Sequence, residues 1–208
     1  LAERQAQIDQ LERLLTELQY NSDNERRPEI LTKLASLYRE LGEVDRAKPK
    51  LEEALALEDV QPVPTATKAR TLYELSRISH QQGEISLALT QAQTAADIAH
   101  QQQDYRIETD ALTVMAYITA QQGDVATALS SYEQMLSLCE QSDYEYGKAA
   151  TLNNMAQVIA QQGDIDRALN LWQQSLDLKE RIGDVQGKAA TLNNMAMWRV
   201  KQAIPNAS

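Results

Sequence analysis

A nine-residue stretch, Lys-Ala-Ala-Thr-Leu-Asn-Asn-Met-Ala, occurs twice in the chain, at residues 148–156 and again at residues 188–196. An identical copy of this length at a fixed spacing is very improbable by chance, and a period between 20 and 50 residues is typical of stacked-repeat proteins. A single unit of such a protein cannot bury its apolar face alone, so neighbouring units have to stack. The chain is therefore expected to fold as an array of similar units.

A glycine marks the same point in each of four units. These glycines are Gly42, Gly83, Gly123 and Gly163, in steps of 41, 40 and 40 residues, and an acidic residue follows each of them. A glycine just past a helix end can adopt the left-handed conformation that closes the helix, and an acid on the next residue favours the start of another helix. The pattern predicts four helical hairpins, each with a tight turn at its glycine.

Apolar residues keep a helical spacing on both sides of these turns. Five residues after each turn there is an alanine, namely Ala47, Ala88, Ala128 and Ala168. A small side chain there lets the two helices of a hairpin approach closely. Before the turns, Leu152, Met155 and Ala156 share one helical face with spacings of three and four, and we expect them and their copies Leu192, Met195 and Ala196 to belong to the packing that every repeat shares. The sequence thus predicts an all-α fold.

The same register extends to both ends of the chain. The predicted hairpins span residues 28–58, 66–101, 105–141 and 145–182, and single helices are predicted at 3–20 and 186–202. One array would then cover residues 1–203, and residues 204–208 are predicted to be an unstructured tail. Two alternatives remain open: a segment cut from a longer array, which we favour, or a natural array with half-repeats as caps.

Composition and charge exclude several classes of function. The net charge of −10 argues against nucleic acid, because phosphate binding needs a Lys/Arg surface. Cys139 is the only cysteine, which fits a reducing compartment, and the longest apolar run, 111–120, is too short to span a membrane. No phosphate-binding loop, nucleophile elbow or zinc-helix motif is present. We expect a soluble, cytoplasmic protein that is not an enzyme, has no cofactor or metal and does not bind a membrane.

The order of Leu, a small residue, Gly, Ala and an aromatic residue resembles the tetratricopeptide repeat, over roughly residues 3–202. The Leu-Asn-Asn-Met-Ala stretch and the Ala47–Pro49 run are similar to the longer repeats of kinesin light chains and related adaptor proteins. The resemblance implies a right-handed superhelical solenoid of antiparallel hairpins, with about four full repeats and a flanking helix at each end. It also implies a concave groove, lined by the first helix of each hairpin, that binds an extended or helical peptide.

The two Asn pairs are the leading candidates for such binding. Carried over from the resemblance, Asn153, Asn154, Asn193 and Asn194 would hold the backbone of the peptide. Asn is unfavourable inside a helix, so another interaction should offset its cost, and an amide can both donate and accept hydrogen bonds. The alternative is that each Asn bonds to the neighbouring repeat and fixes the stacking.

Other candidates lie on the first helices of the predicted hairpins. They are Tyr73, Arg77, Tyr117 and Gln157, of which the tyrosines suit the role of anchors because they offer a large contact area at low entropic cost. The alternative for these residues is a solvated inner face without a ligand.

The leading functional hypothesis is a protein-interaction module, part of a larger protein, that binds a peptide or helix of a partner in the groove. The alternative is a structural or sensor segment of a regulator that self-associates, or that relays a signal without a groove peptide. Met195, Met197 and Trp198 on the last predicted helix are candidates for end-to-end self-association, because a missing neighbour leaves apolar surface exposed.

Overall fold

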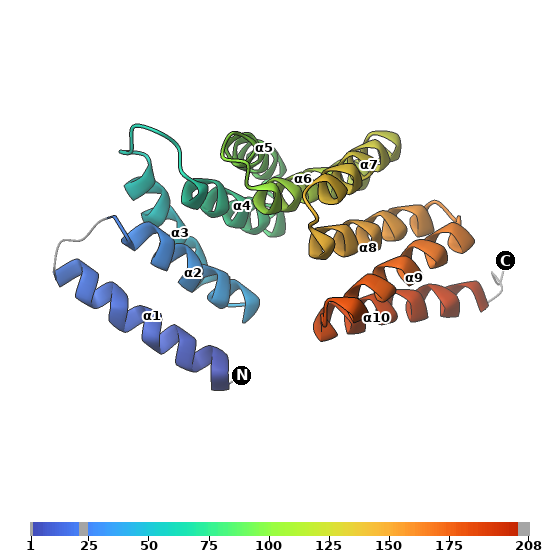
Figure 1. Cartoon of the computed structure of the whole chain (residues 1–208), viewed down its shortest axis with the longest axis horizontal. Coiled ribbons are helices and arrows are strands. Elements are labelled where there is room, and N and C mark those ends of the chain that lie inside the picture. The colour runs from blue at the N-terminus through green and yellow to red at the C-terminus, as the bar shows by residue number, and fades with distance from the viewer. Residues whose placement is uncertain (1, 21–24, 204–208) are drawn as a thin grey trace. The chain divides into compact units, whose positions relative to one another are not determined.

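The computed structural model describes residues 2–20 and 25–203, and within them it contains ten α-helices and no strand (Figure 1). The helices are α1 (Ala2–Tyr20), α2 (Arg27–Glu40), α3 (Val44–Glu58), α4 (Ala66–Gln81), α5 (Ile85–Gln101), α6 (Tyr105–Gln121), α7 (Val125–Gln141), α8 (Glu145–Gln161), α9 (Ile165–Arg181) and α10 (Val185–Ala203). The prediction of an all-α fold is confirmed. The predicted tail, 204–208, lies outside the described residues.

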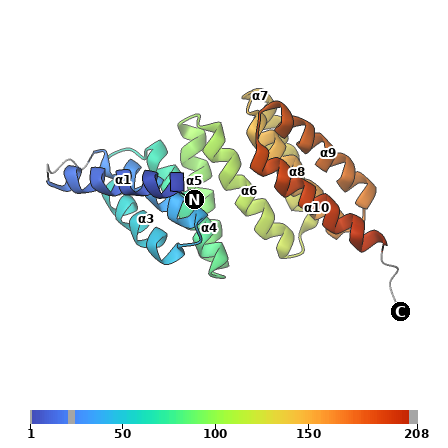
Figure 2. The same cartoon turned by 90° about the horizontal axis from the view of Figure 1, so that it is seen from below.

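The chain divides into two compact units, Leu1–Val114 and Met115–Ser208, and the division falls within α6. Figure 2 shows the helices of each unit from a second direction. The units are described one at a time below. The prediction of one array over residues 1–203 stays a prediction.

The first unit is built on the hairpins α2–α3 and α4–α5. Its core contains two clusters of buried apolar side chains, one around Leu34, Leu51 and Ile78 and the other around Leu72 and Ile107. Helix α1 adds Ile8 to the first cluster, so it packs as one more layer of the same core. The alanines five residues after the turns, which include Ala47 and Ala88, are fully buried. This burial agrees with the close helix approach that the sequence predicts.

The second unit contains the hairpin α8–α9, with α7 and α10 packed beside it. Tyr132 on α7 and Trp172 on α9 are its largest fully buried side chains. They occupy the same position in successive repeats, nine residues after Gly123 and Gly163. This position of the repeat therefore supplies the large side chains of the core in this unit.

The glycine turns have the predicted conformation. Gly83 has φ +78°, its N–H donates to the carbonyl of His80 at 3.0 Å, and the N–H of Glu84 donates to the carbonyl of Ser79 at 2.8 Å. This pair of bonds is the Schellman motif, which satisfies carbonyls left open at the end of a helix. The other three turn glycines also have positive φ, between +80° and +93°.

The turns that follow α5, α7 and α9, each leading to the next first helix, also use a left-handed residue. It is Gln103 (φ 57°), Asp143 (φ 52°) or Gly183 (φ 74°), at steps of 40 residues. This second turn was not predicted from the sequence. Its signal is weak because a glycine occupies only one of the three positions.

The last helix departs from the expected packing. Leu152 and Ala156 on α8 are buried, but their copies on α10 are not: Leu192 is 47% exposed and Ala196 is also exposed. Helix α10 packs against α8 and α9, and no further helix follows it in the described residues. A side chain that would face the next repeat is therefore left at the surface.

Candidate functional site

Three of the four predicted asparagines gather at one place in the second unit. Asn153 Oδ1 on α8 accepts hydrogen bonds from Asn194 Nδ2 at 3.2 Å and from Thr191 Oγ1 at 3.1 Å, both on α10. Asn153 Nδ2 donates to Asn154 Oδ1 at 3.2 Å. We call Asn153, Asn154, Thr191 and Asn194 the amide cluster. It joins the first helices of two successive repeats.

A buried lysine supports the amide cluster from α9. Lys179 is only 6% exposed, and its Nζ donates to Thr191 Oγ1 at 2.7 Å and to the carbonyl of Gly187 at 3.3 Å. Burial lowers the pKa of this ammonium group, because taking it out of water disfavours the charged form. With Lys179 as its donor, the Thr191 hydroxyl can use its own proton for Asn153. The hydrogen bond from Lys179 Nζ to Thr191 Oγ1 thus connects the amide cluster to α9.

Lys179 is not among the residues predicted from the sequence, although the sequence carries a signal for it. The equivalent positions in two other repeats, sixteen residues after the turn, hold Ala99 and Cys139, and both are buried. Glu58 holds the same position in the first hairpin and is also buried, so a charged residue at this position indicates a buried polar contact.

The amide side chains differ in how accessible they are. Asn193 is exposed, while Asn154, Asn194 and Gln157 are partly buried. Because Asn153 is committed to α10, its contacts favour the stacking interpretation for this one residue. Asn193 and Gln157 make no hydrogen bond to another side chain within the part of the chain described. They keep amide donors and acceptors open to a ligand.

In the first unit, Tyr73 and Arg77 are one helical turn apart on α4 and partner each other. Arg77 Nη1 donates to the Tyr73 hydroxyl at 3.1 Å, and the guanidinium carbon lies 5.7 Å from the ring centroid. Burial raises the pKa of Tyr73 to about 12. It also raises the pKa of the neighbouring Asp110 carboxyl to about 6, although Arg70 and Arg77 act in the opposite direction. This group of charges is only partly solvated.

A second polar network joins the first helices of the two hairpins in this unit. Glu74 on α4 is nearly buried, and it accepts from Ser36 Oγ at 2.9 Å and from Arg39 Nε at 2.6 Å, both on α2. Nearby, the hydroxyls of Thr32 and Thr71 lie 2.7 Å apart. The contacts of Glu74 and the pair of threonines together fix how α2 and α4 stack.

Two cavities open along the same helices. The larger, of about 580 Å³, lies between α1, α2 and α4 and is lined by Gln7, Gln10, Leu11, Lys33, Ser36, Leu37 and Arg70. The smaller, of about 180 Å³, lies between α2, α4 and α6. Lys33 and Arg70 line both, and Lys33 is paired with Glu29 at 2.5 Å. Neither cation is among the residues predicted from the sequence.

The predicted residues therefore fall into two groups. Tyr73 and Arg77 lie in the first unit, whereas Tyr117, which is partly buried on α6, lies in the second with Gln157 and the asparagines. Within the described residues, no set of His, Cys, Asp and Glu side chains has the geometry to hold a metal ion. No helix there is both long and apolar enough to cross a membrane.

Two parts of the chain match family models described as Tetratricopeptide repeat, over residues 30–60 and 147–203. A search of curated protein sequences finds no significant match.

Solved structures agree with the repeat assignment. BtubC (BKLC) from P. vanneervenii is 18% identical, with 99% of this chain and 95% of that chain covered at a TM-score of 0.66. The nearly identical TPR-like repeats of a kinesin light chain-like protein from Podosopora anserina are 17% identical, with 87% and 89% covered and a TM-score of 0.60. YrrB, described as a TPR protein with an unusual peptide-binding site, is 19% identical, with 90% and 86% covered and a TM-score of 0.52. The repeats, hairpin turns and family matches agree that residues 30–60 and 147–203 are tetratricopeptide repeats, and the structural neighbours of the chain include kinesin light chain-like arrays.

Proposed function

We propose that this protein is an interaction module that binds a peptide or a helical segment of a partner protein along the first helices of its hairpins. Tetratricopeptide repeats are an interaction fold and are generally not enzymatic, and YrrB is a related example with a peptide-binding site. The buried Cys139 is consistent with a reducing, cytoplasmic location, which we also propose.

The observation that carries the proposal is that two first helices present amides without a side-chain partner, the exposed Asn193 on α10 and the partly buried Gln157 on α8. An amide offers a donor and an acceptor at once, which matches the N–H and C=O of a peptide backbone. Asn in mid-helix lowers helix stability relative to Ala. At Asn153 the contact with α10 offsets this cost, whereas at Asn193 no contact to another side chain does so, and a ligand contact is the proposed compensation.

The first unit supports the same function with different chemistry. Its larger cavity, of about 580 Å³, combines the apolar Leu11 and Leu37 with the cations Lys33 and Arg70. Tyr73 adds an aromatic side chain on α4. Apolar surface with a few well-placed polar groups is the usual composition of a ligand site.

The proposal is tested by panning a random peptide phage library against the immobilised protein and measuring the enriched peptides by fluorescence anisotropy. We expect Asn193→Ala and Gln157→Ala to weaken binding of a selected peptide by about tenfold, the effect of losing roughly 1.4 kcal/mol of contact. The matched control is Asn170→Ala, which removes an exposed amide on the second helix α9, where it bonds only to Gln174.

The results separate the alternatives clearly. Equal loss of binding in Asn170→Ala and Asn193→Ala would place the peptide elsewhere on the molecule. A library that yields no saturable binder would count against the proposal as a whole.

A second candidate function is self-association through α10. Four large apolar side chains of this helix are exposed, namely Val185, Leu192, Met197 and Val200. Of the residues expected to mediate this contact, Met197 is 45% exposed, whereas Met195 is buried and Trp198 is partly buried. The four exposed apolar side chains form the surface on which a second copy would pack.

A further inference from the structure

Ion pairs recur where one repeat passes into the next. An acidic side chain at the end of a second helix pairs with a lysine in the first turns of the following helix. The pairs are Asp59 with Lys68 at 2.7 Å, Glu140 with Lys148 at 2.6 Å, and Glu180 with Lys188 at 3.1 Å. In all three the acid comes first in the chain and the lysine second.

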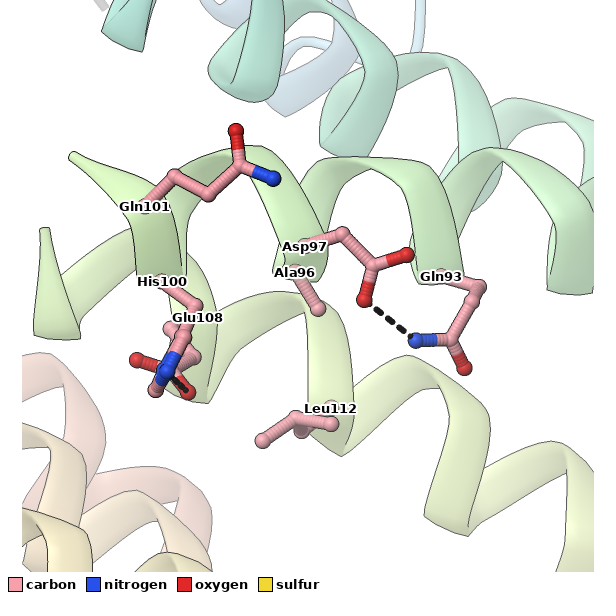
Figure 3. Close-up of a pocket in the computed structure, with 7 residues that line it drawn as sticks. All are labelled: Gln93, Ala96, Asp97, His100, Gln101, Glu108 and Leu112. Carbon is pink, nitrogen blue, oxygen red and sulfur yellow. Dashed lines mark hydrogen bonds and ion pairs between the residues drawn. The ribbon is translucent and has the colours of Figure 1, made fainter. Parts of the chain in front are cut away.

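The junction between α5 and α6 reverses this order. His100 takes the place of the acid and Glu108 takes the place of the lysine, with Nδ1 and Oε1 at 3.0 Å (Figure 3). A lysine carries its charge at neutral pH, whereas a histidine is charged only when it is protonated. This junction therefore has a carboxylate but lacks the permanent cation of the other three.

The carboxylate at this junction is buried. Glu108 is 9% exposed, and its Oε2 has no hydrogen-bond partner among the described residues. It lies in the first turn of α6, where an acidic side chain interacts favourably with the helix dipole. A buried carboxylate that keeps an unpaired oxygen calls for a further partner, since such groups are normally paired.

A cavity of about 310 Å³ adjoins this carboxylate (Figure 3). Asp97 adds a second acid to its lining, held by Gln93 at 2.8 Å, and Ala96 and Leu112 add apolar surface. None of the lining residues is a lysine or an arginine. The His100 side chain is 73% exposed, so it can turn aside from Glu108 without leaving a packed environment.

We propose that this cavity binds an organic cation, an alkylammonium or guanidinium group, which supplies at this junction the charge that a lysine supplies at the others. Glu108 pairs with the cationic head, Asp97 strengthens the negative potential, and Ala96 and Leu112 contact the alkyl chain. The cation is either a free amine or the side chain of a Lys or Arg on a partner protein. The site is separate from the amide cluster and does not depend on the proposed peptide function.

Ligand-observed saturation-transfer NMR with n-butylammonium tests the chemistry directly, with 1-butanol as the uncharged counterpart. We expect saturable binding of the amine, with a dissociation constant on the order of 1 mM, and no saturable binding of the alcohol. The His100 imidazole signal reports the location. The chain has two histidines, so a His80→Gln variant leaves His100 alone, and its resonance should shift with the same dissociation constant.

Two variants decide whether Glu108 is responsible. Glu108→Gln keeps the shape but removes the charge, and it should weaken the amine by at least about tenfold. The double variant His100→Glu with Glu108→Lys gives this junction the acid–lysine pair of the other three. The introduced lysine should then occupy the site and abolish binding of the amine. Because this variant restores an arrangement already present three times in the chain, it should unfold at the same temperature as the wild type or higher.

Equal amine binding in the wild type and either variant would overturn the proposal, as would equal binding of amine and alcohol. Spermidine and Nα-acetyl-lysine amide then distinguish the sources. Tighter binding of spermidine identifies a free polyamine, and tighter binding of the lysine derivative identifies a protein side chain. An Asn193→Ala variant should bind n-butylammonium normally, so failure of the peptide proposal would not affect this test.

Discussion

Thr191 Oγ1 donates a hydrogen bond to Asn153 Oδ1 across 3.1 Å, and Thr71 contacts Thr32 in the same relation in the other unit, at 2.7 Å. Thr32 and Asn153 both lie ten residues before a turn glycine, and each partner lies 39 or 38 residues further along the chain. One position of the repeat thus makes a polar contact to the next first helix in both units. Either a threonine or an asparagine at this position makes the contact.

The first prediction concerns stability. Asn153→Ala should lower the free energy of unfolding by about 1–3 kcal/mol, because it leaves Asn194 without its acceptor and Thr191 with only the carbonyl of Gly187. Asn193→Ala should change it by less than about 0.5 kcal/mol, as is usual for an exposed site. Urea denaturation followed by circular dichroism measures both. Similar losses in the two variants would show that Asn193 also serves the stacking.

The second prediction compares two buried tyrosines. The Tyr132 hydroxyl has no hydrogen-bond partner in the described residues, whereas the Tyr38 hydroxyl donates to Glu12 and accepts from Arg46 at 2.7 Å. Tyr132→Phe should therefore be neutral or stabilising. Tyr38→Phe should cost about 1–2 kcal/mol, since it removes bonds to charged groups. Thermal unfolding of the two variants checks the contrast, and a cost for Tyr132→Phe as large as that for Tyr38→Phe would contradict it.

The third prediction is a pH dependence. Burial raises the pKa of Asp110 to about 6, so the folded state binds this proton more tightly than the unfolded state does. Its contribution to stability is then greatest below the unfolded pKa of about 3.9 and is lost as pH rises through about 6. At pH 7 Asp110→Asn should be more stable than the wild type by up to about 3 kcal/mol. The difference between the two should shrink as pH falls towards 4, and a difference independent of pH would contradict the prediction.

The fourth prediction concerns the turns between hairpins. Gln103 and Asp143 adopt positive φ where Gly183 occupies the third equivalent position. A left-handed residue other than glycine costs roughly 1–2 kcal/mol, and glycine loses part of that gain through its own chain entropy. Gln103→Gly should therefore raise the free energy of unfolding by about 0.5–1 kcal/mol. Gly183→Ala is the reciprocal control and should lower it, which denaturant titration of both variants would test.

The fifth prediction tests self-association. Leu192 is 47% exposed on α10, so Leu192→Glu should leave folding intact. If α10 is the contact between copies, sedimentation velocity should show a concentration-dependent dimer for the wild type and a monomer for the variant. Leu87→Glu, a similarly exposed leucine on α5, is the control. A wild type that stays monomeric at all concentrations would exclude this function.

Local rules were sufficient to predict the repeat. Gly83 ends its helix as expected because its conformation depends only on the few residues around it, and Ala88 is buried because every hairpin needs a small residue there. The identical Asn153 and Asn193 could not be distinguished in this way. Their difference depends on whether a further first helix lies beside them, which is a property of the array and not of the local sequence.

The charged junctions show what a different comparison of the repeats would have revealed. Aligning apolar positions finds the hairpins but not the reversal at His100 and Glu108, because these two residues lie outside the apolar pattern. Aligning the acids and lysines at the helix ends would have found it. The burial of Glu108 and the cavity beside it still required the packed structure.

The order of charge at the junctions also limits how such a chain can lengthen by duplication. A second copy of residues 145–184 placed after the first would bring Glu180 against a new Lys148, an attractive pair. A tandem copy of residues 105–144 would instead bring Glu140 against a new Glu108, two carboxylates at one junction. The array can therefore grow from its C-terminal repeat without an electrostatic penalty, and the nine-residue identity between 148–156 and 188–196 lies where such growth is permitted.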